Sequence, residues 1–225
     1  MDSDDDSTLD AIDWERIPIF PLQTVFFPRT YLPLHIFEPR YRRMTADCIE
    51  GGLPLAVVLA RPGEDLMGEA EVFPIAGVGT FERHERLPDG RYNLVLRGMS
   101  RIKILEELPH RPYRIVRAQP LDDRWPAGGA PALAKDVDTL RACVSRVTGF
   151  IGEAPIAADV RKRVGAATDP AMLADVVASL FIEDPLVRQA LLEELDIGRR
   201  LASVTGTLAE LVLRASAARG GGTLQ

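Results

Sequence analysis

The pattern of apolar and polar positions changes character near the middle of the chain. Up to about residue 121, apolar residues occur in short runs separated by proline and glycine, which is typical of β-strands. Beyond about residue 132, apolar residues recur every three or four positions, which is typical of amphipathic helices. The sequence therefore predicts a strand-rich part followed by a helical part, joined by a proline- and glycine-rich linker at 122–131.

Prolines interrupt the first long apolar segment, at 17–28. Because proline cannot donate a hydrogen bond to a sheet, they mark strand starts, edges or sharp corners. The sequence Leu-Pro-Asp-Gly at 87–90 is typical of a hairpin turn, since its glycine can adopt a positive φ. Further strands are predicted at 53–60, 72–81, 92–96, 101–105 and 113–118.

One short helix is predicted within the strand-rich part. It begins at Pro39, which suits a first helical position, and ends at Gly51 and Gly52. Its apolar residues form a single stripe: Tyr41, Met44, Cys48 and Ile49.

The second half contains further helix signals. One helix begins near Pro131, and Asp169 and Asp184 each precede a proline, a pair that favours the start of a helix. A last helix carries a seam of apolar residues spaced by four and three: Ile197, Leu201, Val204, Leu208 and Leu211. This heptad-like seam either packs within the chain or joins two copies as a homodimer, and packing within the chain is favoured.

The composition is that of an ordinary globular protein, with 46% hydrophobic and 27% charged residues among 225. Six aspartates and no basic residue lie at 1–13, which accounts for the whole formal charge of −6 and predicts a disordered acidic tail. The neutral remainder argues against binding to nucleic acid or membrane. No apolar run approaches the roughly 20 residues that span a bilayer, and the acidic start is unlike a signal peptide. We therefore expect a cytoplasmic protein.

No group of residues predicts catalysis. Cys48 and Cys143 lie far apart and are expected to be reduced, and the histidines, at 35, 84 and 110, lack metal-binding spacing. None of the three lysines follows a glycine, as a phosphate-binding loop requires. A hydrolase is disfavoured because no nucleophile, base and orienting group can be named together. We expect no cofactor and no metal.

Several segments carry a more specific signal when they are taken in order: 17–28, 32–42, 77–80, 87–104, 169–170, 173–179, 189–196 and 200–201. Together they resemble the N-terminal domain of Lon proteases, which recognises substrates, over about residues 15–213. The resemblance implies an α+β fold, in which a PUA-like, partly closed β-barrel at 14–121 precedes a helical bundle at 132–215. A flexible tail is expected at 216–225.

The same resemblance implies a function in recognition. In Lon proteases an ATPase and a Ser-Lys peptidase follow this domain, and neither is expected here, so we expect a stand-alone, non-enzymatic module. It is expected to bind unfolded or specific polypeptide segments, or a partner protein, as an adaptor or holdase-like factor. RNA binding is the alternative, since a PUA-like barrel allows it by analogy of fold. The near-neutral body of the chain argues against it.

Binding to unfolded segments requires exposed apolar side chains. The candidate peptide-binding residues lie in the proline-rich loop after the first strand and in a later loop: Phe26, Phe27, Tyr31, Leu32, Leu66 and Met67. Ordinary core packing is the alternative for each of them, and it is favoured.

Structural roles are expected at several polar and glycine positions. Glu38 and Arg40 are predicted to pair with each other and to cap the helix that follows, although gripping a peptide is the alternative. Gly77 and Gly79 indicate a bend or bulge in their strand. The motif residues for which we predict a structural role are Glu38, Arg40, Tyr41, Gly90, Gly98 and Arg101.

Overall fold

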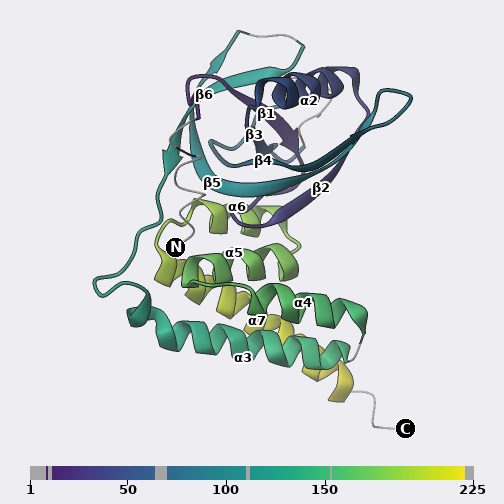
Figure 1. Cartoon of the computed structure of the whole chain (residues 1–225). Helices are drawn as coiled ribbons and strands as arrows, with labels where there is room; N and C mark the ends of the chain where they lie inside the picture. The colour runs from purple at the N-terminus through teal and green to yellow at the C-terminus, as the bar shows by residue number, and fades with distance from the viewer. Residues whose placement is uncertain (1–8, 10–11, 64–69, 110–111, 153, 221–225) are drawn as a thin grey trace. The chain divides into compact units, whose positions relative to one another are not determined.

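The computed structural model in Figure 1 describes residues 9, 12–63, 70–109, 112–152 and 154–220. The chain divides into two compact units, Met1–Asp122 and Asp123–Gln225. In the described residues, the first unit contains a β-sheet with helix α2, and the second unit contains only helices apart from one isolated bridge. This content confirms the predicted α+β class.

Six strands form a mixed sheet in the described part of the first unit: β1 (Ile17–Leu22), β2 (Tyr31–Ile36), β3 (Leu55–Leu59), β4 (Ile75–Arg86), β5 (Tyr92–Leu108) and β6 (Arg114–Leu121). Their order is β2-β5-β4-β3-β1-β6, and β5 also pairs with β6. The pairings therefore close five strands into a ring, with β2 outside it (Figure 1). β1 and β3 run parallel, and the other pairs run antiparallel.

Alternate residues of the central strands face two separate hydrophobic clusters. In β3, Leu55 and Val57 belong to one cluster, and Ala56 and Val58 belong to the other. Successive side chains of a strand point to opposite faces, so the clusters lie on opposite sides of the sheet. This explains why every residue of β3 is buried.

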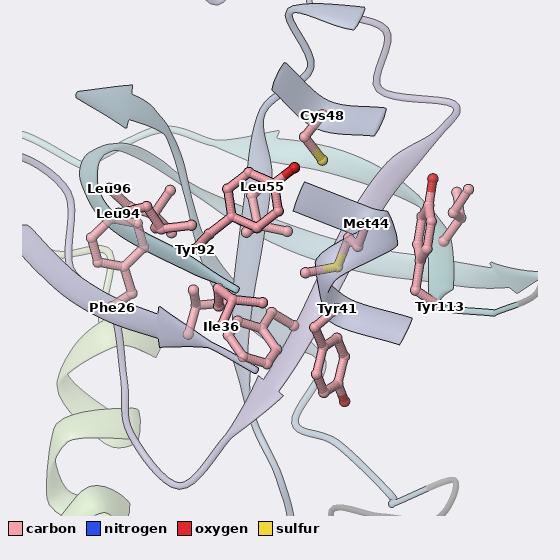
Figure 2. Packing of buried hydrophobic residues seen from close by; sticks show 13 residues of the cluster. Phe26, Ile36, Tyr41, Met44, Cys48, Leu55, Tyr92, Leu94, Leu96 and Tyr113 are labelled. Atoms are coloured by element: carbon pink, nitrogen blue, oxygen red, sulfur yellow. The ribbon is translucent and has the colours of Figure 1, made fainter. Parts of the chain in front are cut away.

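Helix α2 (Pro39–Gly51) covers the first of these clusters, with the bounds that the sequence predicts. It ends at Gly52, whose φ of 62° is the left-handed conformation that glycine tolerates. Figure 2 shows Tyr41, Met44 and Cys48 extending from α2 into the cluster. Burial raises the pKa of the Cys48 thiol to about 12, so it stays protonated at neutral pH.

Glycines allow the loop between β1 and β2 to lie directly against the sheet. A Cβ atom on Gly77 would overlap the carbonyl oxygen of Phe26, and one on Gly98 would overlap that of Phe27. The pairing of β4 with β5 shifts register between Val78 and Gly79, which confirms the predicted irregularity in β4.

The described residues of the second unit form a short 3-10 helix η1 (Ala130–Leu133) and five α-helices: α3 (Ala134–Ile151), α4 (Pro155–Gly165), α5 (Pro170–Phe181), α6 (Pro185–Glu193) and α7 (Ile197–Gly220). Asp169 caps α5 by accepting a hydrogen bond from the Met172 amide at 2.8 Å, and Asp184 caps α6 through the Leu186 amide at 2.8 Å. Both caps confirm the sequence prediction.

The apolar seam of α7 is used within the second unit. Ile197, Leu201, Val204 and Leu208 are completely buried, and Leu211 is half-buried. A homodimer through these residues would require them to be exposed, so the intramolecular alternative is the one that the structure shows.

A buried arginine joins the start of α7 to residues that precede η1. Arg200 is fully buried and donates two hydrogen bonds to the Asp123 carboxylate, at 2.8 and 2.9 Å. Its Nε lies 3.3 Å from the Asp175 carboxylate on α5, and its Nη1 donates to the Glu194 carbonyl at 2.8 Å. Each charge of this group therefore has an opposite charge beside it.

Candidate functional site

Strand β2 offers an edge that is unpaired within the described residues. It is the terminal strand in the sheet order, and its register runs only along β5, from Tyr31 opposite Arg97 to Ile36 opposite Tyr92. An unpaired edge is a ready template for another extended segment, because its outward N–H and C=O groups lack strand partners.

The direction of the backbone groups of β2 follows from one hydrogen bond. The Gly98 amide donates to the Thr30 carbonyl at 2.9 Å, so Thr30 faces β5. Neighbouring residues of an antiparallel strand direct their backbone groups to opposite edges. The groups of Tyr31, Pro33 and His35 therefore face away from β5. Proline is tolerated at such an outward position because no ladder bond is lost there.

The side chains of the same residues form an exposed stripe. Tyr31, Pro33, His35 and Phe37 are all exposed, with Tyr31 at 52% and Phe37 at 61% of their full accessible area. We call these four residues the β2 stripe. The intervening residues, such as Leu34, pack against the core instead. The stripe combines two aromatic rings with an unpaired strand edge.

A hollow of about 650 Å³ lies along this face of β2, β5 and β4. Pro33 and Val95 line it opposite each other, Arg83 and Glu85 of β4 also line it, and His35 and Asn93 form its next row.

A polar network fixes the ring of His35 at the edge of this hollow. The His35 Nδ1 lies 2.7 Å from the Asn93 Oδ1, and its Nε2 lies 3.3 Å from the Arg91 guanidinium. Because a guanidinium only donates, Nε2 accepts and Nδ1–H donates to Asn93. Phe37 stacks beside the ring, with 6.3 Å between centroids. Two polar contacts and the ring of Phe37 therefore hold the imidazole at the edge of the hollow.

The structure separates the six candidate peptide-binding residues. Phe26 and Phe27 are buried, at 1% and 0% exposure, so core packing is correct for both and neither offers surface to a peptide. Tyr31 lies on the β2 stripe, and Leu32 is half-buried against the core. The other two candidates, Leu66 and Met67, fall outside the described residues.

Sequence reasoning missed the other members of the β2 stripe. Pro33, His35 and Phe37 follow Tyr31 at alternate positions, a period of two that marks one face of a strand. The proline at an outward position is a second available signal, because it favours an edge strand.

The motif residues with predicted structural roles lie at an ion pair, a helix start, a turn and in the interior of the first unit. Glu38 and Arg40 form the expected ion pair at 3.0 Å, and the Arg40 guanidinium lies 4.5 Å from the centre of the Tyr41 ring. Glu38 occupies the N-cap of α2, but its side chain makes no capping hydrogen bond, so the predicted cap is wrong in that respect. Gly90 adopts a positive φ of 81° in the hairpin turn, and Arg101 is buried.

Two kinds of feature are absent from the described part of the chain. Among these residues, no group of three or more histidine, cysteine or acidic side chains could hold a metal ion. None of the helices described is long and apolar enough to cross a membrane.

Comparison with known proteins gives consistent similarities along most of the chain. Residues 16–210 match the family model of the ATP-dependent protease La (LON) substrate-binding domain. Lon protease 2 of Myxococcus xanthus is 27% identical over 191 residues, which cover 84% of this chain and 23% of that protein. The Lon protease of Roseiflexus castenholzii is 30% identical over 200 residues, covering 86% of this chain and 24% of that protein. The chain thus spans about a quarter of the length of these relatives.

Solved structures share the fold. A Lon N-terminal domain protein from Xanthomonas campestris matches with a TM-score of 0.60 and 21% identity, covering 85% of this chain and 97% of that one. The N-terminal domain of the Mycobacterium avium complex Lon protease matches with a TM-score of 0.61 and 18% identity, covering 87% and 98%. The resemblance noted in the sequence is confirmed, and the chain belongs to the family of Lon substrate-binding domains.

Proposed function

We propose that the first unit binds extended polypeptide segments by adding them as a further strand along β2. The observation that carries this proposal is the coincidence of the unpaired β2 edge with the exposed β2 stripe. Membership of a substrate-binding family supports recognition of polypeptides in general. Strand addition supplies a specific way to achieve it, since backbone hydrogen bonds are indifferent to sequence and side-chain contacts add preference.

The β2 stripe and the hollow beside it determine how long the bound polypeptide segment is and which side chains it carries. Tyr31 and Phe37 are six residues apart, so in extended chain their rings are separated by roughly 20 Å. A segment of about six residues therefore reaches from one ring to the other. Apolar side chains on it would cover the two rings and the Pro33–Val95 part of the hollow. Unfolded chains display such segments, whereas folded proteins bury them.

This mode of binding suits an adaptor or a holdase-like factor. A holdase suppresses the aggregation of an unfolded client when it is present in equal amounts, without nucleotide. An adaptor increases the rate at which a separate ATP-dependent protease degrades the same client. Both assays use the whole chain, and they distinguish the two roles directly.

We expect the exposed aromatics of the β2 stripe to supply binding energy. Tyr31→Ser and Phe37→Ser should each weaken the affinity for a labelled, permanently unfolded polypeptide by about five- to tenfold, equivalent to about 1–1.4 kcal/mol. Fluorescence anisotropy measures this, and thermal unfolding checks that each variant remains folded.

Leu105→Ser is the matched control for these variants. Leu105 is a large apolar residue of β5 that is 48% exposed, but it lies beyond the part of β5 that pairs with β2. Its replacement should leave the affinity unchanged. Equal affinities of the wild-type, Tyr31→Ser and Phe37→Ser proteins would contradict the proposed site.

The β2 stripe does not favour RNA binding through a PUA-like barrel. We propose that the ring of five strands corresponds to that barrel. The β2 stripe, however, carries only one ionisable basic side chain, His35, and the hollow beside it contains Glu85 as well as Arg83. An RNA-binding surface instead combines aromatic rings with an excess of positive charge.

A further inference from the structure

A second hollow, of about 580 Å³, lies between α2 and the hairpin that joins β4 to β5. One face of α2 lines it, from Pro39 through Arg42 and Arg43 to Glu50. Arg86 and Tyr92 line it from the hairpin. In contrast to the hollow beside the β2 stripe, it is lined by three arginines.

Two of these three arginines have no carboxylate within ion-pair distance among the described residues. Arg43 forms an ion pair with Asp47 at 2.9 Å, but Arg42 and Arg86 form none. Several other arginines of the first unit are paired, as Arg91 is with Asp89 at 2.7 Å. Neither guanidinium is in an ion pair with a described residue, and the hollow has one acidic lining residue, Glu50. The Asp89 carboxylate of the hairpin turn also lies near: its pKa is lowered mainly by its hydrogen bonds from Arg91 and further by the charge of Arg42.

The turn of the hairpin keeps one of these groups in place. A Cβ atom on Gly90 would lie 2.5 Å from an Nη atom of Arg42, so the guanidinium rests directly against the glycine. The positive φ of Gly90, 81°, also disfavours any larger residue there. The turn thus gives Arg42 its position at the hollow.

A largely buried tyrosine adds a hydrogen-bond donor. Tyr92 is only 7% exposed, yet it lines the hollow, and its hydroxyl makes no hydrogen bond with the described residues. Figure 2 shows its ring reaching from β5 toward α2. The Tyr92 hydroxyl is not among the buried polar atoms that lack a partner, so it reaches solvent at the hollow and can donate to a ligand there.

We propose that this hollow binds oxyanion groups, namely the side-chain carboxylates of an acidic stretch in a bound polypeptide. Arg42 and Arg86 supply charge, and the Tyr92 hydroxyl supplies a neutral donor. This deepens the proposed function and rests on it for the polypeptide. Pro39 of the hollow follows Phe37 of the β2 stripe by two positions, so one segment reaches both. The preferred ligand is an apolar segment with acidic residues beside it.

Two labelled peptides of one apolar sequence test the inference, one flanked by three aspartates and the other by three asparagines. We expect the acidic peptide to bind about tenfold more tightly at about 50 mM salt, and we expect this advantage to shrink at about 300 mM. In the Arg42→Gln/Arg86→Gln protein both peptides should bind equally. In Arg16→Gln, a control at an exposed arginine just before β1, the advantage should remain.

The peptides distinguish failure of the inference from failure of the proposed function. Equal binding of both peptides by the wild-type protein overturns the oxyanion site and leaves strand addition intact. An advantage that persists in the double variant also overturns the site. If neither peptide binds to the wild-type protein, both proposals are overturned.

Discussion

Single residues decide how the loop between β1 and β2 lies on the sheet. Gly77 and Gly98 lie so close to the backbone at 26–28 that neither has room for a side chain. This close approach buries Phe26 and Phe27, so the aromatic rings next to Tyr31 in sequence belong to the core. The glycines thereby separate the residues that stabilise the fold from those available to a partner.

We expect Gly77→Ala to destabilise the protein by about 2–3 kcal/mol, because the new methyl group forces the loop at Phe26 away from the sheet. Gly149→Ala is the control, since a Cβ atom added to this glycine of α3 would meet nothing within 4 Å. It should stabilise by about 0.5–1 kcal/mol. Urea unfolding measures both, and unchanged stability in Gly77→Ala would show that the loop has space to move.

At the residue scale, the sequence alone does not determine which side chains of the candidate site are exposed. Residues 26–37 contain several aromatic and large apolar side chains near prolines, and their composition does not reveal which face outward. That depends on the register of β2 with β5 and on the glycines of other strands. The period of two at 31–37 indicates which side chains share the outward face, whereas proximity to prolines does not indicate this.

At the scale of helices and strands, the sequence predicts the elements whose first and last residues are typical of helix or strand ends. Helix α2 begins and ends as expected because Pro39 and Gly52 act locally. Helix α4 was not predicted: its buried residues Ala157, Val160 and Val164 form a narrow stripe of small side chains. Such a stripe gives a weak periodic signal, and the helix depends on packing within the second unit.

The ion cluster around Arg200 links elements of the second unit. Arg200→Met should destabilise by about 3–5 kcal/mol, because the buried Asp175 carboxylate loses its cation. Adding Asp175→Asn should recover part of this loss. Arg214→Met, at an exposed pair of the same helix, should change stability by less than about 0.5 kcal/mol. Thermal or urea unfolding measures all three, and a loss at Arg200 no larger than that at Arg214 would contradict a stabilising role.

At the scale of the molecule, the first unit places two proposed binding features beside the hairpin of β4 and β5. The β2 stripe lies along the outer face of β2 and β5, and the arginine-lined hollow lies between the hairpin and α2. We propose that the first attracts apolar extended segments and that the second adds a preference for acidic neighbours. In this proposal, selectivity comes from positive charge next to a strand edge that accepts many sequences.

The measurement that tests strand addition most directly compares His35→Pro with His35→Ala. The His35 amide faces away from β5, so proline there removes an outward donor without breaking a bond to β5. We expect His35→Pro to bind an unfolded polypeptide about tenfold more weakly than His35→Ala, with similar thermal stability. A peptide N-methylated at alternate residues should likewise lose binding to the wild-type protein. Equal affinities of the two variants, together with undiminished binding of the methylated peptide, would contradict recognition at the β2 edge.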